Sequence, residues 1–211
     1  MSTWSIVLAA GRGRRYDLEV LKQYEMLGGR RVIDLALEGA RLVSDGVVLV
    51  VGPDFVDDVE PLADVVVGGG DERSDSVRRG LAVVPGDCDI VVVHDGARPL
   101  AAGALFEAVI EAVLAGADAA IPGVAVTDTI KRVEDGRVVG TLDRDDLVAV
   151  QTPQAFRADM LRLAHEGNPQ ATDDAALVED VGGIVVIVPG DPGNLKITTP
   201  RDLSVAATHL A

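Results

Sequence analysis

The chain has 211 residues, 48% of them hydrophobic and 25% charged, which is the balance of an ordinary globular protein with a sizeable core. Its formal net charge of −15 disfavours nucleic acid and anionic membranes as partners, and no apolar run is long enough to cross a bilayer. One cysteine, Cys88, excludes an internal disulfide, and the absence of a signal-peptide pattern predicts a cytoplasmic protein.

Short apolar runs alternate with helical patterns along the chain. The runs are continuously apolar, which predicts strands covered on both faces in a doubly wound, mainly parallel α/β sheet with helices on both faces. The predicted strands are Trp4–Leu8, Val47–Val51, Asp64–Val67, Ile90–His94, Ala119–Ile121 and Ile184–Val188. The predicted helices are Val32–Val43, Ser74–Val83, Ala101–Leu114, Ala158–His165, Asp173–Val181 and Arg201–His209.

Residues 124–150 interrupt this alternation. Asp135 and Gly136 lie between two β-prone flanks, which is typical of a hairpin turn. A lone two-stranded ribbon is marginal in water, so we expect a protruding β-arm that packs on a partner subunit. No linker or repeat divides the chain, and residues 1–211 are predicted to form a single domain.

The first predicted strand ends in a glycine turn crowded with arginines, AAGRGRR. Gly11 and Gly13 would let backbone amides approach an anion, and the arginines would add charge-assisted hydrogen bonds. The turn lacks the third glycine of the dinucleotide fingerprint and the Gly-Lys-Ser/Thr ending of the nucleoside-triphosphatase loop. It therefore predicts phosphate binding of another kind, with a solvated basic turn as the alternative.

Other polar segments follow predicted strands, whose carboxyl ends form the ligand-binding edge of such a sheet. The segment GGGDERSDS, residues 68–76, would admit a base or ribose close to its backbone, although a helix-capping turn explains it equally well. Asp95 directly follows a buried strand and suits Mg²⁺ held jointly with substrate phosphates, while Arg98 is placed to meet a second anion. We interpret His94, beside Asp95, as a structural group rather than a base.

The three lysines, Lys22, Lys131 and Lys196, stand out among 19 basic residues. Lys196 lies just before a helix opened by Pro200. The sequence offers no defensible acid–base carboxylate pair, no Ser–His–Asp grouping and no zinc-ligand cluster. Glycine, arginine, lysine and one strand-end aspartate suit phosphoryl or nucleotidyl transfer, where catalysis is positioning and charge stabilisation.

Taken in order, nine segments resemble the 2-C-methyl-D-erythritol 4-phosphate cytidylyltransferase family: LAAGRGRR, LKQY, GGDERSDSV, VHDGARP, DTIK, LDR, QTPQAF, TDDAALVE and NLKITTPRDL. They spread over nearly the whole chain. The resemblance implies a Rossmann-like nucleotidyltransferase fold and a homodimer joined through the β-arm. It also implies Mg²⁺-dependent attack of methylerythritol phosphate on CTP.

The resemblance also implies roles for individual residues. The catalytic residues would be Arg15, Lys22 and Lys196. The nucleotide would be bound by Ala9, Ala10, Gly11, Gly13, Gly70, Asp71 and Ser76. The polyol phosphate would be bound by Asp95, Arg98, Thr152 and Thr172, together with Thr129 and Arg144 from the partner's arm, and Asp95 would also hold the metal. Leu21 stands where the family commonly has proline before its lysine, which puts the rigidity of that loop in question.

Three alternatives remain open at this point. The enzyme could act on another polyol phosphate, such as ribitol 5-phosphate, because such cytidylyltransferases share most of these motifs. A nucleotide-binding regulator without activity is disfavoured by the cation set and Asp95. An NAD-dependent oxidoreductase is disfavoured by the missing third glycine.

Overall fold

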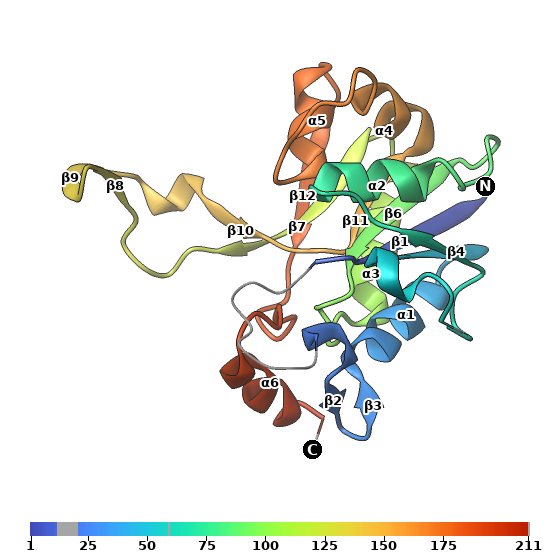
Figure 1. Cartoon of the computed structure of the whole chain (residues 1–211). Helices are drawn as coiled ribbons and strands as arrows, with labels where there is room; N and C mark the ends of the chain where they lie inside the picture. The colour runs from blue at the N-terminus through green and yellow to red at the C-terminus, as the bar shows by residue number, and fades with distance from the viewer. Residues whose placement is uncertain (12–20, 59, 211) are drawn as a thin grey trace.

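The computed structural model describes residues 1–11, 21–58 and 60–210, and its centre is an eight-stranded sheet (Figure 1). The strand order is β10-β7-β11-β6-β1-β4-β5, and β12 pairs with the edge of β7 that faces away from β11. The strands are β1 (Thr3–Ala9), β4 (Gly46–Val51), β5 (Val65–Gly68), β6 (Ile90–Asp95), β7 (Ala119–Ala125), β10 (Val148–Val150), β11 (Gln154–Arg157) and β12 (Val185–Pro189). The six predicted strands are confirmed, as is the Rossmann-like α/β class.

Parallel pairing joins β6, β1, β4 and β5, and it also joins β12 to β7. Strand β11 was not predicted. It runs antiparallel between β6 and β7, and its Phe156 is fully buried. The strand has four residues and polar ends, Gln154 and Arg157, so its sequence lacks the apolar run by which a buried strand is recognised.

Helices cover both faces of the sheet: α1 (Val32–Arg41), α2 (Arg73–Leu81), α3 (Gly103–Leu114), α4 (Ala158–Ala164) and α5 (Asp174–Asp180). The last helix, α6 (Pro200–Ala207), packs outside these two layers. Successive strand residues point to opposite faces. Ile6 of β1 packs in the core under α2, α4 and α5, whereas its neighbour Val7 packs under α1 and α3. Both are fully buried, and burying each such side chain contributes about 1.5–3 kcal/mol. All six of the described helices were predicted, with ends that differ by at most two residues.

Short elements complete the fold. A small hairpin joins β2 (Met26–Leu27) to β3 (Arg30–Arg31), and it packs with α6 in a third apolar cluster around Leu27 and Ile197. The described residues include three 3₁₀ turns, η1 (Lys22–Tyr24), η2 (Pro53–Phe55) and η3 (Arg144–Asp146). Within the described part of the chain, none of the helices has the length and apolarity needed to cross a membrane.

The predicted β-arm extends away from the rest of the molecule (Figure 1). Its hairpin strands are β8 (Lys131–Glu134) and β9 (Arg137–Thr141). Asp135 and Gly136 both have positive φ, 47° and 75°, as the predicted Asp-Gly turn requires. The ends of the 124–150 range belong to the main sheet, where Val148–Val150 pairs with the outer half of β7.

Candidate active site

A cavity of about 630 Å³ opens at the carboxyl ends of β1, β5 and β6. This volume lies within the range of small-molecule sites. Most residues predicted to bind the nucleotide or to carry the chemistry line it: Ala9, Ala10, Gly11, Lys22, Gly70, Asp71, Ser76, Asp95 and Lys196. Gly13 and Arg15 lie outside the described residues, so their predicted roles stay predictions.

At two glycines of the cavity wall the backbone lies close to neighbouring side chains. A Cβ atom at Gly69 would lie 2.2 Å from Ala10 Cβ, and one at Gly70 would lie 2.2 Å from Asp75 Cβ. No larger side chain is accommodated at either position without a shift. The Gly70 N–H donates to Ser76 Oγ at 3.2 Å, which fixes the loop on the first turns of α2. The glycine run after β5 is therefore needed for close packing, and it leaves backbone exposed to the cavity.

Asp95 and Lys196 meet inside this cavity. Lys196 Nζ donates to Asp95 Oδ2 at 2.6 Å, and Arg98 Nε lies 4.0 Å from the same oxygen. Burial alone would raise the pKa of Asp95, but Lys196, Arg73 and Arg98 outweigh it and lower that pKa to about 2. Asp95 is therefore an ionised carboxylate at neutral pH, held beside a lysine contributed from 101 positions further along the chain.

His94 is fully buried behind Asp95, as its interpretation as a structural group predicts. The Arg98 carbonyl can only accept, so His94 Nε2 carries the ring proton and donates to it at 3.2 Å. In the neutral ring Nδ1 then accepts from the Thr152 hydroxyl at 3.1 Å, while Thr152 Oγ1 accepts from the Asp95 N–H at 3.0 Å. Both ring nitrogens are used in the neutral form. Burial lowers the pKa of His94 to about 4, against the smaller opposing effect of Asp95.

The remaining predicted substrate residues do not line this cavity. The hydroxyl of Thr152 is buried in the His94 network, and Arg98 Nη1 donates to the Asn194 carbonyl at 2.7 Å. Thr172 is exposed just before α5. On the arm, Thr129 and Arg144 line a separate hollow of about 420 Å³, and their predicted role in a partner's site stays a prediction.

Gln23 and Arg73 are among the residues of the cavity wall that sequence reasoning missed. Gln23 is buried and its Nε2 donates to the Ala9 carbonyl at 2.8 Å, which ties η1 to the end of β1. Arg73 opens α2 and forms an ion pair with buried Asp174. Each belongs to a motif already noted, LKQY or GGDERSDSV, but nothing in the pattern distinguished these side chains from their neighbours.

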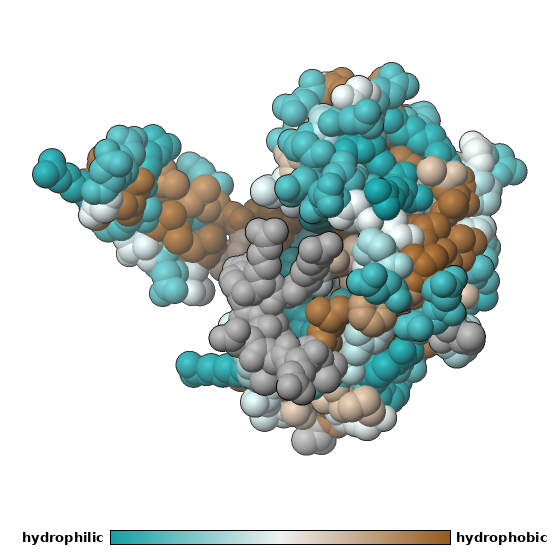
Figure 2. Space-filling view, in the orientation of Figure 1, coloured by the Kyte–Doolittle hydropathy of each residue, from teal (hydrophilic) through white to brown (hydrophobic). Residues whose placement is uncertain are grey.

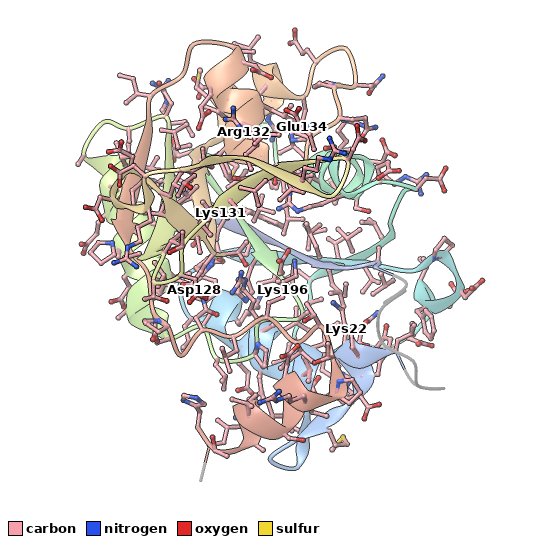
Figure 3. The ribbon with its side chains drawn as sticks, turned by 90° about the vertical axis from the view of Figure 1, so that its left-hand side faces the viewer. Lys22, Asp128, Lys131, Arg132, Glu134 and Lys196 are labelled. Atoms are coloured by element: carbon pink, nitrogen blue, oxygen red, sulfur yellow. The ribbon has the colours of Figure 1, made fainter. Side chains whose placement is uncertain are left out.

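The lysines of this edge come from distant elements. Figure 3 labels Lys22 of η1 and Lys196 of the segment before α6, together with Lys131 of the arm strand β8. A glycine-lined cavity at the carboxyl edge of a Rossmann-like sheet, with two lysines and one ionised aspartate in its wall, is the arrangement of a nucleotidyltransferase.

Comparisons with known proteins identify the family within this class. The family model described as 2-C-methyl-D-erythritol 4-phosphate cytidylyltransferase matches residues 3–211. Curated relatives of that name from Frankia casuarinae and Nocardia farcinica are 47% and 44% identical. These matches cover 98% and 99% of this chain and 80% and 94% of the relatives. The chain belongs to the 2-C-methyl-D-erythritol 4-phosphate cytidylyltransferase family.

Solved structures agree with this assignment. The crystal structure of a 4-diphosphocytidyl-2C-methyl-D-erythritol synthase from Anaerococcus prevotii superposes with a TM-score of 0.84 at 30% identity. The match covers 99% of this chain and 98% of that one. The protein is thus a nucleotidyltransferase of this family, and the NAD-dependent oxidoreductase and the inactive regulator are not favoured.

Proposed function

We propose that the enzyme joins CTP to 2-C-methyl-D-erythritol 4-phosphate, giving 4-diphosphocytidyl-2-C-methyl-D-erythritol and pyrophosphate in isoprenoid biosynthesis. The single observation that carries the proposal is the cavity lined by Lys22, Asp95 and Lys196 together with glycine backbone, in a chain of this family. The printed names of the relatives favour methylerythritol phosphate over ribitol 5-phosphate as the acceptor.

The chemistry needs no general base. A phosphate monoester is already an anion at neutral pH, so one of its oxygens attacks the α-phosphorus of CTP directly. The bond from the α-phosphorus to the bridging oxygen breaks, and the β- and γ-phosphates leave as pyrophosphate. This accounts for a site in which His94 is buried, neutral and fully hydrogen-bonded.

The lysines address the main electrostatic difficulty, which is the approach of one anion to another in a protein of net charge −15. Lys22 and Lys196 would stabilise the charge that develops around the α-phosphorus and on the departing pyrophosphate. Before the substrate binds, Asp95 holds the ammonium group of Lys196 in position. An arriving phosphate then competes with Asp95 for this ammonium group.

A divalent cation is also part of the proposal. Among the described residues no three metal-ligand side chains form a group, so a protein-only metal cage does not fit. One ionised carboxylate shared with substrate phosphates is the usual mode for Mg²⁺, and Asp95 fits it. Asp95 would hold the ion, which when bound would neutralise phosphate charge during the transfer.

The arm supports a homodimer in which the arm reaches a second copy of the chain. Val133 and Val138 on the hairpin are 54% and 62% exposed, and Figure 2 shows apolar surface along the arm. Thr129 and Arg144 line the arm's own hollow, where they are available to another subunit. In this proposal they complete the partner's substrate site. The predicted cytoplasmic location stays a prediction.

Pyrophosphate release tests the function. The assay combines the enzyme and Mg²⁺ with CTP, ATP, GTP or UTP, and with methylerythritol phosphate or ribitol 5-phosphate. We expect release only with CTP and a preference for methylerythritol phosphate. Faster release with ribitol 5-phosphate would show that ribitol 5-phosphate is the preferred acceptor. No release with any pair would overturn the proposed function.

A further inference from the structure

Arg73 is a cation of the cavity wall that the proposed mechanism does not use. It is the first residue of α2, and its side chain is 25% exposed. Arg73 is therefore neither fully exposed at the surface nor fully buried in the core. It lines the same cavity as Asp95 and Lys196. Its charge is also one of those that lower the pKa of Asp95, which places the guanidinium within electrostatic reach of that carboxylate.

The far side of Arg73 is fixed by a buried acid. Arg73 Nη1 donates to Oδ2 of Asp174, whose side chain is fully buried, and His165 Nε2 donates to the other oxygen at 3.1 Å. Burial would raise the pKa of Asp174, but His165 and Arg73 outweigh it and lower that pKa, so the carboxylate is ionised. One oxygen of this buried anion therefore holds Arg73, and the other is oriented by a buried histidine.

The surrounding backbone is also held. Ser74 Oγ donates to the Ala171 carbonyl at 3.0 Å and accepts from the Ala171 N–H at 3.1 Å. Arg78 Nη1 donates to the Pro169 carbonyl at 2.8 Å. The start of α2 and the segment before α5 thus form one unit. A guanidinium carries five N–H donors in a rigid fork, so an arginine anchored to Asp174 at one edge keeps donors for a second anion.

Resting on the proposed function, we propose that Arg73 binds a phosphate group of one of the two substrates, and that Asp174, oriented by His165, is its positioning residue. The ligand class is a phosphoryl oxygen, from either the nucleotide triphosphate or the phosphate monoester of the acceptor. A purely structural ion pair would not need to line the cavity beside Asp95.

The test uses Arg73→Gln, Asp174→Asn and the double variant in the full chain. Arg73→Gln leaves a buried carboxylate with one partner and can destabilise the fold, whereas the double variant removes both charges together. Arg157→Gln is the matched control, because Arg157 forms exposed ion pairs and pairs with Ile90 at the opposite end of β6 from Asp95. Folding is checked by thermal unfolding.

Steady-state kinetics give the first readout. Loss of a charged hydrogen bond should raise KM for one substrate about tenfold in Arg73→Gln. A rise in KM for CTP identifies the triphosphate, and a rise for the polyol phosphate identifies the monoester. Asp174→Asn should raise the same KM, and the double variant should resemble Arg73→Gln because both changes act on one contact. A folded double variant with wild-type KM for both substrates would overturn the proposal.

Ligand-induced stabilisation gives a second readout that needs no turnover. The increase in Tm produced by CTP alone, or by methylerythritol phosphate alone, is compared between the wild type and the double variant. We expect the double variant to lose most of the increase for one ligand, and the Arg157→Gln control to keep both. If wild-type protein releases no pyrophosphate, the proposed function fails, yet a Tm increase that depends on Arg73 still supports the phosphate contact. Equal increases in both proteins would contradict it.

Discussion

Burial of neutral His94 should make the stability of the protein depend on pH. Its pKa is about 4 in the folded protein against an ordinary 6.5, so the unfolded chain binds a proton more readily between these values. Because the pKa of His94 is lower in the folded protein, its contribution to the free energy of unfolding is complete above pH 6.5 and is lost as the pH falls towards 4. Between pH 7.5 and pH 5 this one group should cost about 2 kcal/mol of unfolding free energy.

The comparison variant is His94→Gln, whose amide can still donate to the Arg98 carbonyl but does not titrate. Urea unfolding of both proteins at pH 7.5, 6.5, 5.5 and 5 gives two pH profiles. The variant will be less stable at pH 7.5, because the Thr152 hydroxyl loses its acceptor. Its profile should nevertheless be flatter, so that the difference between the proteins narrows by about 2 kcal/mol at pH 5.

Titrating groups other than His94 are common to both proteins and cancel in this difference. Parallel profiles would refute the assignment of a neutral, buried His94. Nitrogen chemical shifts of the imidazole at pH 5.5 give a direct check, since we expect a neutral ring with its proton on Nε2.

Three further predictions concern catalysis and the loop before η1. Lys196→Ala should lower kcat about a hundredfold, with an unchanged circular dichroism spectrum, and near-normal turnover would remove this lysine from the mechanism. Mixing the two inactive variants Lys22→Ala and Arg144→Ala should restore activity through hybrid dimers, and no recovery despite measured subunit exchange would argue against a shared site. Leu21 has φ −65° and ψ 134°, which suits proline, so Leu21→Pro should raise Tm by about 1–3 °C without lowering kcat; a lower Tm would show that the position rejects the ring.

The main elements were predictable because their signals are local. Continuous apolar runs identify strands such as Ile90–Asp95, and an Asp-Gly pair identifies the turn of the arm. The short strand β11 was not predictable in this way, because its burial comes from insertion between β6 and β7 and not from its own composition.

The residues of the site likewise divide into those with a local sequence signal and those without one. Strand-end position and motif marked Asp95, Lys22 and Lys196, and the structure brings all three to one cavity. Motif alone could not distinguish Thr152, whose hydroxyl is used behind Asp95, from a residue that faces the cavity. The importance of Arg73 depends on Asp174, 101 positions away, and a contact over that separation leaves no mark on the local pattern.

The cavity draws on η1, the start of α2, the end of β6 and the segment before α6, so it spans almost the entire length of the polypeptide. On the ribosome the strand that ends in Asp95 emerges long before Lys196, its partner at 2.6 Å. If Lys196 contacts the substrate as proposed, full substrate affinity therefore requires that the C-terminal segment has docked. Nucleotide affinity should consequently report complete folding, and a chain that ends before Lys196 should retain much of the sheet while binding CTP weakly.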